Sequence, residues 1–262
     1  MSSTLWLDYE TRSHCDLLKR GVYNYATDPT TEVLIASYAI DNGPVKRWEV
    51  WRDNHMPQAL FLCLTDPRVT IKSHNASFER LITEHVLRIP IHPSRWYCTS
   101  YQGRFVGCPS SLDDLARMVN PAHRKDARGM DLIRRYSIPP YENDPEGLTE
   151  FGAYCDRDVE VMRNLSNPLP PLTDEARAVW AANEIINDMR RDKTGQIQTR
   201  IDELAVRAAL HPASLLSTLI LAAECREGIP AGSPLDKLLR DCALFVHGST
   251  VATNTILEKK GA

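Results

Sequence analysis

Three short acidic segments, far apart in the chain, constrain the fold most strongly, because each one is attached to a different kind of predicted element. The segments are Asp8-Tyr9-Glu10, Asn75-Ala76-Ser77-Phe78-Glu79 and Tyr154-Cys155-Asp156-Arg157-Asp158. The first follows a short apolar strand, the second joins a strand to a helix, and the third lies within a helix. Any fold of this chain has to place one acidic segment on each of these three kinds of element.

The order of the predicted elements indicates an α/β fold with a mixed sheet. Apolar runs predict strands at residues 4–7, 33–40 and 69–72, the second arm of a hairpin at 45–51, and a helix at 58–64. The later part of the chain is mostly helical, with predicted helices at about 79–87, 99–105, 112–119, 130–136 and 148–165. Strands followed by helices are typical of an α/β domain.

The composition is that of an ordinary globular protein. Of the 262 residues, 43% are hydrophobic and 25% are charged. The formal net charge of −3 gives no chain-wide basic field, so any contact with nucleic acid must be local. The seven cysteines are scattered and form no C-x-x-C pair, which argues against a disulfide framework and a zinc site and favours a reducing compartment.

The sequence also predicts a cytoplasmic protein without a membrane partner. The first ten residues already contain Asp8 and Glu10 and lack the basic start and apolar run of a signal peptide. The most apolar stretch, residues 213–223, is about half the ~20 residues that a membrane-spanning helix needs.

In the first acidic segment, Asp8 and Glu10 are expected to project from the same face of a strand, because side chains two apart on a strand share a face. Acidic residues number 34 of 262, so acid-x-acid triplets arise by chance roughly four times in such a chain. A strand end that reaches solvent is the alternative interpretation.

In the second segment, Asn75 and Glu79 lie across a strand-to-helix junction. There a carboxylate is able to lean over the edge of the sheet while the asparagine holds the turn. The alternative is an N-cap asparagine followed by an acidic first helical turn.

In the third segment, an apolar stripe at helical spacing predicts the helix; it comprises Leu148, Phe151, Cys155, Val159, Met162 and Leu165. Tyr154 and Asp158 are then neighbours on an adjoining face, one turn apart. A phenol and a carboxylate so placed are able to hold one water between them. A packed tyrosine beside a solvated aspartate is the alternative.

Together the three segments predict a two-metal hydrolytic site. Hydrolysis of a phosphodiester at neutral pH needs a nucleophilic water and charge relief on the attacking and leaving oxygens. Two divalent cations held by carboxylates provide both. The predicted ligands are Asp8, Glu10, Glu79 and Asp158.

In order and spacing, these segments resemble the motifs of the DEDD 3′–5′ exonucleases, in the subclass whose third motif is Tyr-x-x-x-Asp. Residues 1 to about 190 resemble, more narrowly, the exonuclease half of phage-type family A DNA polymerases. The match extends around the second motif, to Ser73-His74 before it and Arg80 after it. Three further stretches match: Ser111-Leu112-Asp113-Asp114-Leu115-Ala116, Arg124-Lys125-Asp126-Ala127-Arg128-Gly129 and Leu169-Pro170-Pro171-Leu172.

The resemblance implies a ribonuclease H-like mixed sheet flanked by helices and followed by a mainly helical tail. It further implies two Mg²⁺ or Mn²⁺ ions, the first held by Asp8, Glu10 and Asp158, with Asp8 bridging to the second and Tyr154 orienting the water. Glu79 departs from the broader family, which usually has Asp at this position. The extra methylene shifts the carboxylate outward, and Mg²⁺ tolerates misplaced ligands poorly.

Contacts with nucleic acid are predicted at Asn75, Phe78 and a basic cluster. Arg124, Lys125 and Arg128 fall with Arg134 and Arg135 within twelve residues. The cluster is either a solvated helix face or a set of phosphate contacts along a single strand. Phe78, Trp96 and Tyr101 are the aromatic side chains predicted to stack on bases.

The clearest break in the chain is Asn167-Pro168-Leu169-Pro170-Pro171. It predicts an exonuclease domain at 1–166, a linker and polymerase-entrance-like helix at 167–190, and an unassigned helical tail at 191–262. From Cys242 onward, the tail is similar to part of the N-terminal region of the hydantoinase and oxoprolinase family, and no activity is assigned to it.

The expected activity is removal of nucleotides from the 3′ end of single-stranded DNA, without a polymerase domain in the chain. A separate polymerase or replication protein is an expected partner. Two alternatives stay open. One is an exoribonuclease that uses the same carboxylates, because sugar preference rests on contacts to the 2′ position. The other is a catalytically impaired fragment that binds single strands or a polymerase.

Overall fold

The computed structural model describes residues 3–119 and 128–191 of the chain. The chain divides into two compact units, one from Met1 to Thr173 and one from Asp174 onward. Within the second unit, a helix at Asp174–Arg191 (α8) is described, where a helix was predicted. The hydantoinase-like stretch and the side chains of Arg124 and Lys125 lie outside the described residues.

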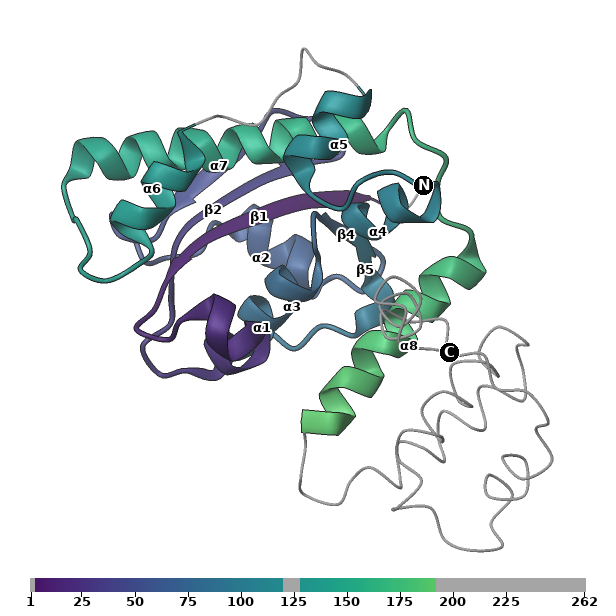
Figure 1. Cartoon of the computed structure of the whole chain (residues 1–262), viewed down its shortest axis with the longest axis horizontal. Helices are drawn as coiled ribbons and strands as arrows, with labels where there is room; N and C mark the ends of the chain where they lie inside the picture. Colours follow the sequence, from purple (N-terminus) through teal and green to yellow (C-terminus); the bar gives the residue numbers. More distant parts are fainter. Residues whose placement is uncertain (1–2, 120–127, 192–262) are drawn as a thin grey trace, which may run out of the picture. The chain divides into compact units, whose positions relative to one another are not determined.

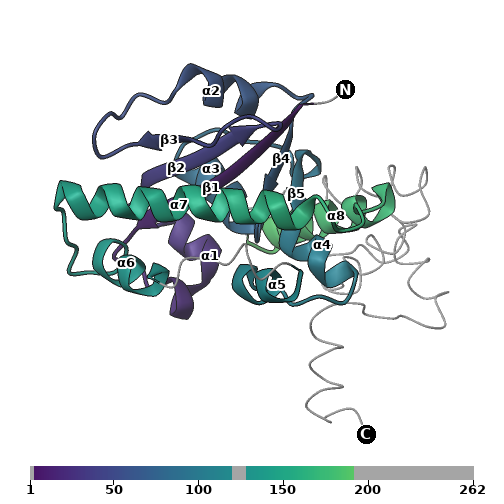
Figure 2. The same ribbon diagram turned by 90° about the horizontal axis from the view of Figure 1, so that it is seen from above.

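The first unit is built on a five-stranded mixed sheet in the order β3-β2-β1-β4-β5 (Figures 1 and 2). The strands are β1 (Thr4–Arg12), β2 (Glu32–Ile40), β3 (Lys46–Glu49), β4 (Thr70–Ser73) and β5 (Trp96–Cys98). The pairs β1–β2 and β2–β3 are antiparallel, whereas β1–β4 and β4–β5 are parallel. This order, with helices on both faces, is the ribonuclease H-like arrangement, so the predicted fold class is confirmed.

The central strand β1 is longer than predicted and is held differently by its two neighbours. It continues past Asp8 to Arg12 because Tyr9 and Glu10 pair with β2. In contrast, β4 pairs with β1 only from Thr4 to Trp6. Beyond Trp6, β1 therefore has a partner strand on one side only.

Eight helices and one 3₁₀ turn are described among residues 3–119 and 128–191. They are α1 (Leu17–Thr27), α2 (Gln58–Thr65), α3 (Ser77–His85), the 3₁₀ turn η1 (Pro93–Arg95), α4 (Thr99–Phe105), α5 (Leu112–Val119), α6 (Gly129–Tyr136), α7 (Pro145–Ser166) and α8. In this part of the chain, no helix combines the length and the apolar character needed to cross a membrane.

The longest helix, α7, runs along one face of the sheet (Figure 2). It begins at Pro145, one turn earlier than predicted, because Asp144 accepts a hydrogen bond from Gly147 N at 2.7 Å and caps the helix. Its predicted apolar stripe is buried, and Val159 and Met162 pack against Trp6 of β1. The stripe thus fixes which face of α7 is turned towards β1.

The opposite face of the sheet carries α2 and α3 (Figure 1). The β1 side chains on the face opposite Trp6 point this way. One of them is Tyr9, whose hydroxyl lies 3.1 Å from Thr83 Oγ1 of α3. Helices on both faces bury the sheet, as expected for an α/β domain.

A partly buried polar contact fixes the position of α7 along the sheet. Arg47 of β3 donates through Nε to both carboxylate oxygens of Asp156 at 3.2 Å, and Ser37 Oγ of β2 donates to Asp156 Oδ1 at 2.6 Å. Gly152 leaves room for the arginine, since a Cβ there would lie 2.5 Å from Arg47 Nη1. The two turns of α7 that carry Tyr154 and Asp158 are therefore anchored to the sheet.

The proline-rich segment after α7 is also fastened to the domain. Gln102 of α4 is buried, and its Nε2 lies 3.1 to 3.3 Å from the carbonyl oxygens of Ser166, Leu169 and Pro170. Leu172 N donates to the Tyr97 hydroxyl at 2.9 Å. The predicted break at 167–171 is thus an ordered part of the first unit.

Candidate active site

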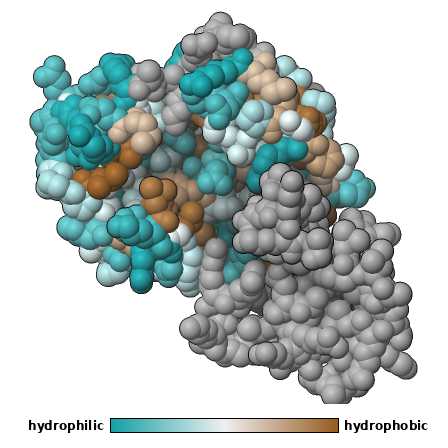
Figure 3. All heavy atoms as spheres, viewed as in Figure 1, coloured by the Kyte–Doolittle hydropathy of each residue, from teal (hydrophilic) through white to brown (hydrophobic). Residues whose placement is uncertain are grey.

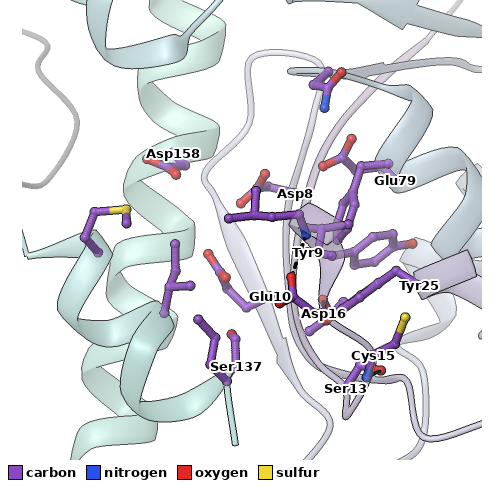
Figure 4. Close-up of a pocket in the computed structure, with 18 of the residues that line it drawn as sticks. Asp8, Tyr9, Glu10, Ser13, Cys15, Asp16, Tyr25, Glu79, Ser137 and Asp158 are labelled. Atoms are coloured by element: carbon purple, nitrogen blue, oxygen red, sulfur yellow. Dashed lines mark hydrogen bonds between the residues drawn. The ribbon is translucent and has the colours of Figure 1, made fainter. Parts of the chain in front are cut away.

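All five predicted catalytic residues line one cavity of about 670 Å³. Asp8 and Glu10 come from β1, Glu79 from α3, and Tyr154 and Asp158 from α7. Figure 4 shows the carboxylates of Asp8, Glu79 and Asp158 reaching the same space from three elements. We call Asp8, Glu10, Glu79 and Asp158 the acidic cluster.

The two acids of β1 face α7, as their spacing predicted. They follow Trp6 at alternate positions, and Trp6 packs on α7. Glu10 is buried and Asp8 is partly buried. The alternative interpretation, a strand end reaching solvent, is therefore wrong.

Cys155 is a member of this site that the sequence analysis missed. A ligand atom from each of Asp8, Glu10 and Cys155 lies within 4.8 Å of the others. The thiol of Cys155 donates to Asp8 Oδ2 at 3.4 Å and to Asp8 O at 3.6 Å. Burial, and then the charges of Asp8 and Glu10, raise the pKa of Cys155 well above its usual value, so it stays a protonated donor. Its place in the apolar stripe hid this role, although the stripe faces the strand that carries Asp8.

Glu79 is held over the sheet edge by an unusual turn. Asn75 adopts a left-handed conformation with φ 61°, which asparagine tolerates well, and Phe78 N donates to Asn75 O at 2.9 Å. The N-cap of α3 is Ala76, without a side-chain cap. Asn75 is therefore the turn residue and not the N-cap that the alternative required.

The Glu79 carboxylate is buried beside Asp8, with only 3% of the residue exposed. Its Oε2 atom has no hydrogen-bond partner among the described residues. Burial, and then the charge of Asp8, raise the pKa of Glu79 well above the usual value for a glutamate.

Tyr154 and Asp158 lie one turn apart on α7, and both are buried, with 2% and 5% of the residue exposed. The solvated aspartate of the alternative interpretation is therefore wrong. Burial, and then the charge of Asp158, raise the pKa of Tyr154 far above its usual range, and the hydroxyl hydrogen-bonds to Asp158. Tyr154 therefore stays neutral and keeps its proton to donate.

His74 also lines the cavity, but both of its ring nitrogens have hydrogen-bond partners. Nε2 lies 2.8 Å from Ser110 O and must donate, since a carbonyl only accepts; Nδ1 lies 3.0 Å from the Thr99 hydroxyl. With both nitrogens so used, His74 is not placed to act as a general base.

The cavity has a second group of residues, which is apolar and was not predicted. We call it the apolar rim; it consists of Leu17 and Leu18 of α1, Met130 and Ile133 of α6, and Ile138 and Pro139 after α6. Three of them are strongly exposed: Leu18 by 95%, Met130 by 78% and Ile138 by 53%. Figure 3 shows apolar side chains gathered on this face of the molecule.

Only some of the residues predicted to contact nucleic acid line the cavity. Asn75 and Phe78 line the cavity, and Phe78 packs on Tyr25 with ring centroids 6.0 Å apart. Trp96 is wrong as a stacking residue, because only 1% of it is exposed. Tyr101 does not line this cavity.

Of the basic cluster, three arginines are described. Arg128 pairs with Glu150 of α7, Arg134 with Asp131 at 2.6 Å, and Arg135 with Glu142 at 2.6 Å. Each of these three guanidinium groups is therefore paired with an acid of the same domain. Their contact with phosphates stays a prediction.

The strand order and the acidic cluster together define a class. A ribonuclease H-like sheet that presents carboxylates from its first strand, the helix after β4 and a long crossing helix is the framework of a hydrolytic nuclease domain.

A comparison with known sequences identifies the relatives more closely. Over 201 residues, the chain is 35% identical to the DNA polymerase of Bacillus phage SP02. The match covers 71% of this chain and 31% of the polymerase, so the chain spans about a third of that relative. The chain is thus a homologue of this phage DNA polymerase, which confirms the resemblance to the exonuclease region of such polymerases. No family model matches the chain.

Solved nucleases show a similar arrangement at low identity. A nuclease in its apo form covers 73% of this chain and 87% of its own length, with 14% identity and a TM-score of 0.48. Brucella melitensis NrnC with bound Mg²⁺ covers 73% and 88%, with 13% identity and a TM-score of 0.44. Likenesses at this level assign nothing further to the chain.

Proposed function

We propose that the first unit is a divalent-metal-dependent 3′–5′ exonuclease that shortens single-stranded DNA. One observation carries the proposal: four carboxylates and a tyrosine, predicted from three separate segments, line a single cavity. A cavity of this volume lies in the range of small-molecule sites and suits the end of a strand better than the middle of a duplex.

The residues present fit Mg²⁺ or Mn²⁺. The acidic cluster offers carboxylate oxygens, which are the ligands that these cations prefer. Buried acids close to one another are costly unless a cation compensates them, and Glu79 Oε2 lacks a hydrogen-bond partner among the described residues. Asp8, Glu10 and Asp158 would hold one ion, and Asp8 with Glu79 a second. Bound cations would supply charge relief to the scissile phosphate.

The protein's own groups then position the reactants. Tyr154, kept neutral by its surroundings and hydrogen-bonded to Asp158, orients an attacking water beside that carboxylate. The water oxygen bonds to phosphorus while the bond from phosphorus to the 3′ oxygen breaks. The products are a nucleoside 5′-monophosphate and a strand one residue shorter with a new 3′ hydroxyl.

The apolar rim suits a single strand of any sequence. Leu18, Met130 and Ile138 present exposed apolar surface and no hydrogen-bonding side chain, so they contact the faces of bases and not their edges. Asn75, Phe78, Arg124, Lys125 and Arg128 are the proposed contacts to the rest of the strand. A separate polymerase or replication protein as partner, and a cytoplasmic location, stay predictions.

The test is digestion of a single-stranded DNA that carries a fluorophore at its 5′ end, in Mg²⁺ or Mn²⁺. The expected result is a ladder of labelled products that shortens one nucleotide at a time and is absent for Asp8→Ala. Asp113→Ala on α5, outside the cavity, is the control and should digest like the wild type.

Three outcomes would overturn parts of the proposal. Immediate release of the labelled nucleotide would reverse the direction. Faster digestion of a matched RNA would favour the exoribonuclease. Binding of either strand without digestion in both metals would leave a nucleic-acid-binding fragment.

A further inference from the structure

The first residue of α6 lies against the ring of Tyr154. A Cβ placed on Gly129 would lie 2.4 Å from Cε2, 2.7 Å from Cζ and 2.8 Å from the hydroxyl oxygen of Tyr154. Real Cβ atoms essentially never approach other heavy atoms within 3.0 Å. An alanine at this position therefore requires the ring or the helix to move.

The backbone does not require glycine here. Gly129 has no left-handed φ, unlike Gly21 and Gly107. Alanine has a higher helix propensity than glycine and would favour the first turn of α6. What glycine provides at this position is space beside the tyrosine.

The Tyr154 ring has little room to retreat. It is buried, with 2% of the residue exposed, and it also stacks on Phe151, with centroids 6.1 Å apart and planes at 16°. Phe151 in turn stacks on Tyr136 at the far end of α6, with centroids 5.6 Å apart. Both ends of α6 therefore bear on the same row of rings, and the hydroxyl of Tyr154 is the end of that row that reaches the acidic cluster.

We propose that Gly129 is a positioning residue for the reaction: by lacking a side chain, it lets α6 close on Tyr154 and fixes the hydroxyl beside Asp158. The inference rests on the proposed nuclease function and on the role of Tyr154 in it. Gly129 itself does not line the cavity. Its effect on the reaction passes entirely through the tyrosine.

The decisive experiment is a double-mutant cycle under single-turnover conditions with Gly129→Ala, Tyr154→Phe and the double variant. Misplacement by about 1 Å costs on the order of 10²-fold in rate, so Gly129→Ala should lose about 10- to 100-fold. In the Tyr154→Phe background, the same substitution should cost less than about twofold, because no hydroxyl remains to misplace. Mn²⁺ binding, followed by electron paramagnetic resonance, should be unchanged in Gly129→Ala.

Gly103→Ala on α4 is the matched control, because its Cβ would meet Leu115 and Pro109 O at 3.4 Å and not Tyr154. Its loss of rate should multiply with that of Tyr154→Phe. If the losses of Gly129→Ala and Tyr154→Phe also multiply, or if Gly129→Ala weakens Mn²⁺ binding, Gly129 acts on the fold in general and the inference is overturned.

A measurement independent of activity separates this inference from the proposed function. The NMR signal of the ¹³C-labelled Tyr154 ring, assigned by its loss in Tyr154→Phe, should shift in Gly129→Ala and stay in place in Gly103→Ala. An unmoved signal in Gly129→Ala would overturn the positioning role. A wild type that is inactive in both metals would instead overturn the proposed function, while the shift would still decide whether Gly129 places the ring.

Discussion

The acidic cluster and the apolar rim line the same cavity but are built in opposite ways. Glu10, Glu79 and Asp158 of the cluster are each less than a tenth exposed and lie on elements of the sheet or packed against it. Leu18, Met130 and Ile138 of the rim are more than half exposed and come from short helices and a loop at the periphery.

This difference separates two tasks. Groups that stabilise a developing charge must be held in place before the reaction, and burial on rigid elements provides that. Groups that bind many different bases need apolar surface but little directional precision. Substitutions in the acidic cluster are therefore expected to change rates and stability, and substitutions in the rim to change binding.

The largest effect is expected for Asp158→Ala. Loss of a carboxylate that would hold a cation beside the reacting phosphate should lower the single-turnover rate by about 10³-fold. Glu160→Ala is a matched control on the same helix, since the Glu160 side chain is 44% exposed and pairs with Arg157. Equal rates for the two variants would show that Asp158 has no particular role in the reaction.

Tyr154→Phe is expected to lower the rate by about 10²-fold, because the phenylalanine fills the same space without the donor. Affinity for single-stranded DNA, measured by fluorescence anisotropy in Ca²⁺, should change less than about twofold. Equal losses in rate and affinity would show that the ring serves binding, as the rim does, and not the reaction.

Glu79 predicts a pH dependence of stability in the metal-free protein. Its pKa is raised by burial, so between about pH 4.3, where an unfolded glutamate ionises, and the higher folded value, the folded state holds the additional proton. Stability due to Glu79 is therefore present below about pH 4.3 and is lost as pH rises through the folded pKa. Each unit of pKa shift corresponds to about 1.4 kcal/mol.

Denaturant unfolding in EDTA from pH 4 to pH 8 tests this prediction. Glu79→Gln cannot ionise, so it should match the wild type at pH 4 and become progressively more stable than it towards pH 8. If the free energies of unfolding of the two proteins change with pH in parallel, the ionisation of Glu79 does not destabilise the fold and the prediction is wrong.

The smallest effect is expected in the rim. Leu18→Ala should weaken binding of single-stranded DNA by about fivefold, or about 1 kcal/mol, through loss of apolar contact. The rate at saturating DNA and the stability should not change, since Leu18 is almost fully exposed. Leu62→Ala is the control, because Leu62 is an exposed leucine on α2 away from the cavity. If both variants weaken DNA binding equally, the rim does not contact the substrate.

The sequence predicted elements whose signals are local. The helix α5 was predicted at the observed residues, and Ser111 Oγ just before it accepts from Asp114 N at 3.1 Å. The helix α1 was missed because it is kinked at Gly21, with φ 76°, and lacks a continuous apolar stripe. The strand β5 was missed because it is only three residues long and is defined by its pairing with β4.

The site divides in the same way. Asp8, Glu79 and Asp158 were predicted to lie together, and they line one cavity, because motif spacing and element type place a carboxylate without knowledge of the rest of the fold. The rim was not found, because Leu18 and Met130 lie over a hundred residues apart and meet only through the approach of α1 and α6 to one cavity. Trp96 was misassigned because an aromatic residue in a sequence carries no mark of its burial.

The clamp that Gln102 forms on the segment after α7 bears on how the chain resists proteases. A stretch with the composition of 167–171 is where a protease is usually expected to nick, since such sites are exposed and easily drawn out of the fold. Here the carbonyls of Leu169 and Pro170 are engaged by a buried amide, and Leu172 is tied to Tyr97. To enter a protease cleft this segment would first have to break those bonds, so limited digestion of the intact protein should spare 167–172, and a fragment cut to end at Ser166 would leave the Gln102 amide without two of its acceptors.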